Sequence, residues 1–296
     1  MKERPEGKPA VRRLPPWLTK KIPLESGSRV ADCLDELRLD TVCRGARCPN
    51  SLDCKSRGRA AFLIMGAHCT RACRFCAMES GAPAPLDPGE PARLAEAVKR
   101  LGLRHAVITS VTRDDLPDGG AAHFAATVAA IRAACSETTV EILVPDFWGD
   151  EAAWETAADA LPDVFNHNME TVERLYHAVR PEADFDRSLA LLDFAKERQP
   201  KMATKSGMMV GLGEELEEIV EAARALRDVG VDIVTVGQYL RPVSARTLEV
   251  ARYVTPEEFA DLEEELRGLG FKAVACSPFV RSSYNAEEAF LKSAER

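Results

Sequence analysis

Three cysteines within eight residues are the feature of this sequence best suited to chemistry. They are Cys69, Cys73 and Cys76, in the stretch HCTRACRFC. Metal sites that only stabilise a fold usually complete their coordination shell, whereas reactive sites leave one position open. Cysteine thiolates are the ligands of iron–sulfur clusters, and a [4Fe–4S] cube takes four of them. Three neighbouring thiolates therefore predict a cube whose fourth iron is free to bind another molecule.

S-Adenosylmethionine is a molecule suited to such an open iron. Its amino and carboxylate groups can chelate the iron, and an electron from the cluster can then break the sulfonium bond and release a carbon radical. In this chemistry the cofactor performs the reaction and the protein supplies position and shielding. The alternative is a zinc site that adds His68 to the three thiols. Adjacent His68 and Cys69 do not readily face one tetrahedral ion, and the paired spacing of zinc ribbons is absent, so the cube is favoured.

A second group of three cysteines, Cys43, Cys48 and Cys54, precedes the first. It can bind three irons of another cube and again lacks a nearby fourth ligand. An electron-relay cluster and a structural zinc site are the alternatives for this group. The chain has nine cysteines, an odd number that indicates reduced thiols serving metals or chemistry. Cys276 is interpreted as an ordinary buried thiol.

The rest of the chain, which must position these thiols, alternates between apolar runs and segments of helical periodicity. The stretch AAFLIM is an unbroken apolar run, as expected for a strand buried on both faces. We predict strands over residues 60–65, 105–111, 139–146, 164–170, 202–211, 232–240 and 271–280. We predict helices over residues 28–40, 90–101, 120–134, 150–160, 171–178, 186–198, 214–229 and 256–268.

This alternation predicts a parallel sheet with right-handed crossovers. Polar stretches follow the predicted strands, for example TSVTRDDLPDGG after the second and GLGE after the fifth. Barrel enzymes build their sites in this way, whereas an open sheet concentrates such residues at one switch point. We therefore expect an α/β fold with a partial (β/α)6 barrel of the TIM type. An N-terminal arm with the second cysteine group is expected over 1–58, the barrel over 59–270, and an extended C-terminal tail that closes the site over 271–296.

Side chains at the predicted strand ends are candidates for binding S-adenosylmethionine. The loop with Ser110 and Asp114 is expected to receive its amino group, although a plain turn with capping carboxylates is the alternative. Asn168 and Glu170 alternate onto one face of the fourth strand and can bond to ribose hydroxyls. The remaining candidates lie at later strand ends, where glycines allow close approach to adenine and cations can meet a carboxylate. They are Lys205, Gly211, Gly213, Glu214 and Arg241.

Composition limits the class of protein. The chain has 296 residues, of which 46% are apolar and 29% charged, as in an ordinary globular protein with a large core. No apolar run approaches the roughly 20 residues that span a bilayer, and the basic, proline-rich start lacks a signal-peptide core. A net charge of −8 argues against broad nucleic-acid binding, and a zinc-ribbon binding module fits poorly because only 6% of residues are aromatic. We expect a cytoplasmic protein with no nucleic-acid or membrane partner.

The stretch CTRACRFC in a barrel of this kind resembles the radical S-adenosylmethionine (radical SAM) superfamily. Further stretches resemble the lipoyl synthase family within it, and the resemblance covers nearly the whole chain. It is carried by PPWLTKKIP, TVCRGARCPN, IMGAHCTRACRFCAM, ITSVTRDDLPDGGAAHF, VEILVPDFWGD, NHNMETVERLYHAVRP, TKSGMMVGLGE, GVDIVTVGQYLRP and VRSSYNA.

The resemblance implies two [4Fe–4S] clusters and S-adenosylmethionine as cofactors. It also implies that Ser283, the serine before the tyrosine of RSSY, is the fourth ligand of an auxiliary cluster bound by Cys43, Cys48 and Cys54. A serine oxygen is a harder, poorer ligand for iron than a thiolate, which suits a cluster that must release sulfide. The implied reaction consumes two S-adenosylmethionine molecules and the auxiliary cluster, and it inserts sulfur at C6 and C8 of an octanoyl chain on a carrier protein.

The implied partners are octanoylated lipoyl carrier domains of 2-oxoacid dehydrogenases or of the glycine cleavage H protein. The resemblance also implies an electron donor such as flavodoxin or ferredoxin, and cluster-assembly proteins. The alternative is a radical SAM paralogue that inserts sulfur into a different acyl chain or carrier. Three departures from the family pattern bear on the carrier: Arg44 and Gly45 replace two acidic residues, Thr112 replaces aspartate or asparagine, and VSARTLEV (243–250) replaces a histidine-leucine-proline stretch.

Overall fold

The computed structural model of the chain describes residues 14–20, 28–242 and 246–295. Its centre is an eight-stranded sheet in the order β1-β2-β5-β6-β7-β8-β9-β10. All neighbouring strands in this sheet are parallel except β1, which pairs antiparallel with β2. The strands are β1 (Asp40–Thr41), β2 (Ala61–Ile64), β5 (His105–Ser110), β6 (Thr139–Leu143), β7 (Val164–Asn166), β8 (Ala203–Val210), β9 (Ile233–Gln238) and β10 (Ala273–Cys276). A separate two-stranded ladder joins β3 (His68–Cys69) and β4 (Glu79–Ser80).

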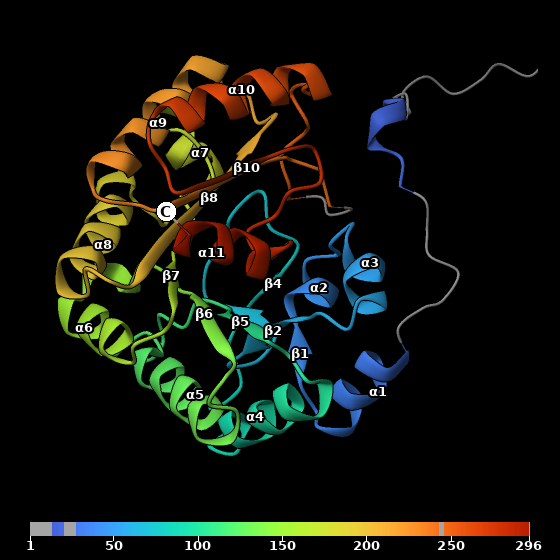
Figure 1. Cartoon of the computed structure of the whole chain (residues 1–296), viewed down its shortest axis with the longest axis vertical. Coiled ribbons are helices and arrows are strands. Elements are labelled where there is room, and N and C mark those ends of the chain that lie inside the picture. The colour runs from blue at the N-terminus through green and yellow to red at the C-terminus, as the bar shows by residue number, and fades with distance from the viewer. Residues whose placement is uncertain (1–13, 21–27, 243–245, 296) are drawn as a thin grey trace, which may run out of the picture.

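Helices follow the parallel strands and cover the outer face of the curved sheet (Figure 1). They are α4 (Glu90–Leu101), α5 (Ala121–Ala134), α6 (Glu151–Asp159), α7 (Tyr176–Val179), α8 (Phe185–Arg198), α9 (Leu216–Asp228) and α10 (Pro256–Gly268), with 3₁₀ turns η2 (Phe147–Gly149) and η3 (Glu173–Leu175). Local sequence sets several of these boundaries. Thr255 and Glu258 form a capping box at the start of α10, and Gly102 ends α4 in the left-handed conformation.

The sheet ends at β1 on one side and β10 on the other, so the barrel is not closed by strand pairing. The expected α/β fold with a partial barrel is therefore confirmed, with one short antiparallel strand added at its edge. Two apolar clusters fill the space between strands and helices, one around Phe62 and Phe124 and the other around Val234 and Phe259. Every residue of β2 is buried, as its unbroken apolar run predicted.

The segment before the barrel carries the second cysteine group on two short helices, which hold Cys43 and Cys54, and on the loop between them, which holds Cys48. It comprises η1 (Pro16–Leu18), α1 (Ser28–Glu36), α2 (Val42–Gly45) and α3 (Ser51–Ser56). Asn50, which is fully buried, donates a hydrogen bond to the carbonyl of Phe279 (2.7 Å) and accepts one from Lys20. The Lys20 ammonium also lies over the rings of Phe279 and Tyr284. The N-terminal segment and the C-terminal tail are thereby held side by side.

The C-terminal tail was expected to be extended, but its strand β10 ends at Cys276. Turns follow at residues 278–279 and 282–285, and α11 (Ala286–Ala294) comes after them. The sequence analysis did not predict this helix. Glu287 of α11 pairs with Arg59, two residues before β2, and with Arg104, directly before β5. The helix therefore lies across the end of the barrel where these strands begin, in the centre of Figure 1.

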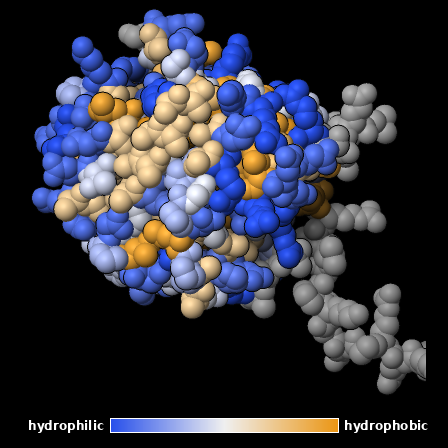
Figure 2. All heavy atoms as spheres, turned by 90° about the horizontal axis from the view of Figure 1, so that it is seen from below, coloured by the Kyte–Doolittle hydropathy of each residue, from blue (hydrophilic) through white to orange (hydrophobic). Residues whose placement is uncertain are grey.

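Most other predicted elements match the structure within a few residues. The exception is the fourth strand: β7 ends at Asn166, and Asn168 and Glu170 lie in the loop beyond it. The face seen from below Figure 1 is mostly hydrophilic toward its edges, with a broad light-orange band of apolar residues across its centre and a few orange patches beside it (Figure 2). Apolar atoms contribute much of the surface of any folded protein, so this band alone indicates no partner. Among the described residues, no helix has the length and apolar character needed to cross a bilayer.

Candidate active site with two cysteine triads

A single cavity of about 420 Å³ brings the two cysteine groups together. We call Cys69, Cys73 and Cys76 the first triad, and Cys43, Cys48 and Cys54 the second triad. The whole first triad lines this central cavity, as do two thiols of the second; those two are Cys43 and Cys48. Four more of the predicted site residues line it as well, and these are Ser110, Asn168, Glu170 and Arg241. Ser283 of the C-terminal tail completes the wall.

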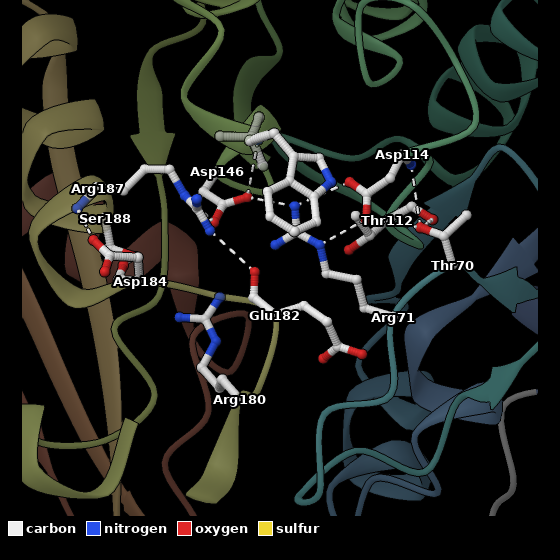
Figure 3. A network of polar contacts seen from close by, with 12 residues as sticks. Thr70, Arg71, Thr112, Asp114, Asp146, Arg180, Glu182, Asp184, Arg187 and Ser188 are labelled. Carbon is white, nitrogen blue, oxygen red and sulfur yellow. Dashed lines mark hydrogen bonds and ion pairs between the residues drawn. The ribbon is translucent and has the colours of Figure 1, made fainter. Parts of the chain in front are cut away.

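The loop of the first triad is fixed to the strand ends through Arg71 (Figure 3). Its guanidinium makes a two-pronged contact with Asp114, at 2.8 and 2.9 Å, and reaches Asp146 at 2.7 Å. Thr70 donates to the carbonyl of Thr112 (3.0 Å) and to Asp114 (3.1 Å). Bidentate arginine–carboxylate pairs are among the strongest and most directional polar contacts. Thr70 and Arg71 therefore hold the loop that carries the first triad against the ends of the neighbouring strands.

Asp146 is the buried centre of this network. Burial alone would raise the pKa of its carboxyl, but hydrogen bonding and charge attraction to Arg71, with help from Arg187, lower the pKa well below the usual range. Arg187 donates to the same carboxylate at 2.8 Å. The exposed ring of Trp148 lies against both guanidinium groups, 4.7 Å from Arg71 and 5.0 Å from Arg187. This network was not predictable from the sequence, because no local pattern reveals which carboxylate Arg71 contacts.

The thiols of the first triad lie close enough to influence one another. Burial, together with the neighbouring Cys73 and Cys69, raises the pKa of Cys76 to about 12, although a hydrogen bond from the Met78 amide acts to lower it. That amide lies 3.4 Å from the Cys76 sulfur, and the Thr112 amide lies 3.3 Å from the Cys69 sulfur. Amide hydrogen bonds to cluster sulfurs are one of the means by which proteins set cluster potentials.

The second triad shows the same mutual influence. Burial, followed by Cys43 and Cys48, raises the pKa of Cys54 to about 11. Gly45, between the first two of these cysteines, approaches Met78 so closely that an added Cβ would stand 2.5 Å from its sulfur. A larger residue at this position would push the second triad away from the loop of the first. Gly45, one of the departures from the family pattern, thus lies where the two loops pack tightly against each other.

The C-terminal tail runs through the barrel beside β8 and β9. The Ser282 hydroxyl donates to the side-chain oxygen of Asn168 (2.6 Å), and the Tyr284 hydroxyl donates to Asp53 (3.0 Å). An added Cβ on Gly237 would stand 2.1 Å from the Val280 carbonyl oxygen, so this glycine makes room for the tail. These contacts hold the tail so that Ser283 lines the central cavity together with Cys43 and Cys48 of the second triad.

Five of the predicted cofactor contacts do not line the central cavity as the structure describes it, and three of them are already bonded to other groups. Lys205 is completely buried and donates to both oxygens of Glu141 and to the Ser282 carbonyl, which uses all three of its donors. Both carboxylate oxygens of Glu214 accept from backbone amides of its own loop, and those of Asp114 accept from Arg71. Lys205, Glu214 and Asp114 do not line the central cavity as the structure describes it. The two predicted glycines, Gly211 and Gly213, do not line it either.

Arg180 is a cavity residue that the sequence analysis did not single out. Its guanidinium donates to the Asn168 carbonyl (2.9 Å) and to the Tyr176 hydroxyl (2.7 Å), and it lies near Cys73 and Glu170. Its Nε atom is buried and has no partner among the described residues, and the same holds for the hydroxyl of Ser110. Unpartnered buried polar atoms are rare in folded proteins. Two such atoms on one cavity therefore indicate a polar ligand.

The other departures from the family pattern take structural roles. Arg44 pairs with Asp35 (3.0 Å) on the surface. Residues 243–245 lie outside the described part of the chain; beyond them, the Leu248 amide donates to the Arg74 carbonyl (2.9 Å) and so joins this segment to the first-triad loop. Arg241 pairs with Glu249 within the same segment.

Comparison with known proteins assigns the family. Residues 63–226 match the radical SAM superfamily. A curated lipoyl synthase from Caldanaerobacter subterraneus subsp. tengcongensis is 56% identical over 275 residues, which cover 93% of this chain and 96% of the relative. One from Rubrobacter xylanophilus is 54% identical, covering 93% of this chain and 85% of the relative. The chain belongs to the lipoyl synthase family.

Solved structures that are less than 25% identical share its fold. SuiB from Streptococcus suis, bound to the precursor peptide SuiA, matches with a TM-score of 0.55 and 15% identity over 72% of this chain and 47% of SuiB, so this chain spans about half of its length. HydG, a maturase of the [FeFe]-hydrogenase, matches with a TM-score of 0.54 and 13% identity, covering 85% of this chain and 69% of HydG.

As a member of the lipoyl synthase family, this chain is a radical SAM enzyme, a sulfurtransferase that uses a [4Fe–4S] cluster and S-adenosylmethionine. The residues present fit these groups. All six cysteines of the two triads are free thiols, and the unpartnered atoms of Ser110 and Arg180 match a ligand with amino and carboxylate groups. Within the described residues, no three His, Cys, Asp or Glu side chains converge on a point that one metal ion could occupy. A cube does not require this, because each of its irons takes its own ligand.

Proposed function

We propose that this chain inserts sulfur at C6 and C8 of a carrier-bound octanoyl group, with the first triad binding the cluster that activates S-adenosylmethionine. In the same proposal, the second triad and Ser283 bind the auxiliary cluster that provides the sulfur. The observation that supports this arrangement is the single cavity lined by thiols of both triads and by Ser283. A radical generated at one triad and a sulfur source at the other must both reach one acyl chain, and a shared cavity allows this.

The first-triad cluster would supply the electron that cleaves S-adenosylmethionine, and the auxiliary cluster would supply sulfide. The chain's own residues bind and shield the reactants. Ser110 and Arg180 offer unpartnered polar atoms for the amino acid part of S-adenosylmethionine, and Asn168 and Glu170 are placed for its ribose. Apolar side chains supply much of the remaining wall; they include Leu63, Phe75, Met78, Val111 and Met209. An apolar wall suits an octanoyl chain and keeps water from a reactive site.

The finer assignments follow the family. We propose a lipoyl carrier domain of a 2-oxoacid dehydrogenase or the glycine cleavage H protein as the substrate, and flavodoxin or ferredoxin as the electron donor. Cluster-assembly proteins would load both triads. A reducing cytoplasm is the proposed compartment, because free cysteines in this number persist there.

The test uses anaerobically reconstituted protein, a strong reductant, S-adenosylmethionine and an octanoyl-lysine peptide from a carrier domain. We expect mass spectrometry to show two added sulfur atoms and two molecules of 5′-deoxyadenosine per lipoyl group. If 5′-deoxyadenosine forms while the octanoyl peptide remains unmodified, the alternative of a paralogue with another acyl chain or carrier is favoured.

A further inference from the structure

A second cavity, of about 680 Å³, opens onto the second triad from the other side. Cys43 and Cys54 line it, and so does Ser283. Cys43 and Ser283 line the central cavity too, so they form part of the wall that separates the two spaces. Two of the candidate ligands of the auxiliary cluster are therefore reachable from two directions, whereas Cys54 lines only the second cavity and Cys48 lines only the central cavity. The second cavity lies toward the start of β5, where Arg104 and His105 form part of its lining.

The lining of the second cavity is strongly basic. Five cationic side chains contribute to it, and these are Arg29, Lys55, Arg57, Arg59 and Arg104. Among the described residues one carboxylate, Glu287, lines it, and it is shared by Arg59 (3.3 Å) and Arg104 (2.7 Å). Arg57 pairs with Asp53 at 3.2 Å, and Lys55 has no ion pair with any described residue. The cavity thus keeps an excess of positive charge in a chain whose net charge is −8.

We propose that the second cavity is the entrance through which an anionic, thiolate-ligated [4Fe–4S] cluster reaches the second triad. A [4Fe–4S] core with four thiolates carries a net negative charge, and a cleft lined by one sign of charge concentrates ions of the opposite sign and steers their approach. The volume lies within the about 300–1,000 Å³ range of small-molecule sites. The proposal rests on the proposed function only in assigning a cluster to the second triad.

The transfer step is a ligand exchange without oxidation or reduction. The thiols of the second triad replace three of the incoming thiolates, and each cysteine proton passes to a departing thiolate. The Ser283 hydroxyl replaces the fourth thiolate in the same way. Because the central cavity is not used for this entry, bound S-adenosylmethionine and substrate would not obstruct it.

The test isolates the second triad by replacing the first. In a full-length chain with Cys69→Ala, Cys73→Ala and Cys76→Ala, only the second triad is expected to take up a cube. The probe is a [4Fe–4S] cluster ligated by four 2-mercaptoethanol thiolates, and stopped-flow absorbance together with Mössbauer spectroscopy follows its uptake. Adding Lys55→Glu and Arg57→Glu should slow uptake at least about 10-fold at low salt. The difference should shrink at about 1 M salt, where the Debye length falls to about 3 Å.

The matched control reverses two exposed cations that line neither cavity, Lys201→Glu and Arg224→Glu, and should change uptake by less than about twofold. Equal uptake by the cavity variant and its parent would overturn the proposal, as would an equal slowing in the control. If the charge-reversed chain does not fold by circular dichroism, Lys55→Gln with Arg57→Gln should show a smaller slowing in the same direction. This experiment measures cluster uptake and not product formation. A failure to make lipoyl product would therefore contradict the proposed function without contradicting the proposed entrance.

Discussion

The ammonium of Lys205 lies 2.6 Å from the backbone carbonyl oxygen of Ser282, to which it donates a hydrogen bond. Ser282 directly precedes Ser283, the proposed ligand of the auxiliary cluster. The same ammonium is held by both oxygens of Glu141, at 2.9 and 3.0 Å. Burial alone would raise the pKa of the Glu141 carboxyl, but Lys205 and His105 outweigh it and lower the pKa to about 2. A buried ion pair inside the barrel therefore anchors the tail that carries Ser283.

Replacing Lys205 with methionine should reveal this anchor. Glu141 would stay buried with only His105 (3.4 Å) and Asn166 (2.9 Å) and without its ammonium partner, and we expect the free energy of unfolding to fall by about 3–5 kcal/mol. The double variant Lys205→Met, Glu141→Leu should recover most of that stability, because no unpaired charge is left, while lipoyl formation stays low in both. Denaturant unfolding and product mass spectrometry measure the two effects. A double variant as unstable as the single would contradict the assignment of the loss to Glu141.

Variants of the first triad and variants of the second triad should affect different steps of the reaction. Cys73→Ala should abolish formation of 5′-deoxyadenosine and leave about four of the roughly eight irons expected per chain. Cys48→Ala should lose a similar amount of iron but retain part of the S-adenosylmethionine cleavage, while sulfur insertion stops. Iron analysis and chromatography of the nucleoside report both results. Lipoyl product from the Cys48 variant would show that the sulfur comes from elsewhere.

Adjacent serines provide a matched pair. Ser283→Ala should remove one ligand of the auxiliary cluster, so that its cluster is lost more readily and product falls at least about 10-fold, with S-adenosylmethionine cleavage preserved. Ser282→Ala removes the hydrogen bond to Asn168 but no proposed ligand, and it should keep the iron content of the parent. Mössbauer spectra of the two proteins distinguish them. Identical loss of iron in both variants would argue against Ser283 as a ligand.

Gly237 should be intolerant of even one methyl group. Its added Cβ would stand 2.1 Å from the carbonyl oxygen of Val280, so Gly237→Ala must displace the tail or strand β9, at a cost of about 1–3 kcal/mol. We expect sulfur insertion to be lost and S-adenosylmethionine cleavage to change by less than about twofold. Gly268→Ala, which faces open space at the end of α10, is the control and should be neutral or slightly stabilising. Normal lipoyl formation by Gly237→Ala would mean that the tail is not confined there.

His167 should make the chain less stable in mild acid. It is buried, bonded to the Val144 carbonyl (2.8 Å) and the Ser188 hydroxyl (3.0 Å), and burial, followed by the charge of Arg180, lowers its pKa to about 4. An unfolded histidine titrates near 6.5. Because the folded pKa is the lower one, the stabilising effect is complete above about pH 6.5 and is lost as the pH falls toward 4.

Between pH 6.5 and 5 this difference amounts to about 2 kcal/mol, at about 1.4 kcal/mol per pH unit. Denaturant unfolding of the cluster-loaded chain at several pH values measures it. His167→Gln keeps neutral hydrogen-bonding groups and should flatten the profile in this window. An unchanged profile in the glutamine variant would assign the acid sensitivity to another group.

Sequence alone determined the features that depend on neighbouring residues. The spacing of Cys69, Cys73 and Cys76 is a property of one loop, and the alternation of apolar runs with helical periodicity follows from local burial, so the cysteine groups and the partial barrel were both predictable. Helix α10 matches its predicted limits because its start is set by Thr255, Pro256 and Glu258. Helix α11 has comparable local signals, with Glu287 and Glu288 in its first turn and Lys292 in its last, and could have been predicted from them; only its position against Arg59 and Arg104 depends on distant residues.

Only the tertiary structure decided which of these features meet. Lys205 and Glu141 are 64 residues apart and become partners because their strands lie in one barrel. Arg71 and Asp146, or Ser282 and Asn168, are likewise joined by strand order and not by spacing. Polar contacts between distant residues leave no periodic trace in a sequence, so neither the anchoring of the tail nor the basic cavity behind the second triad could be predicted from it.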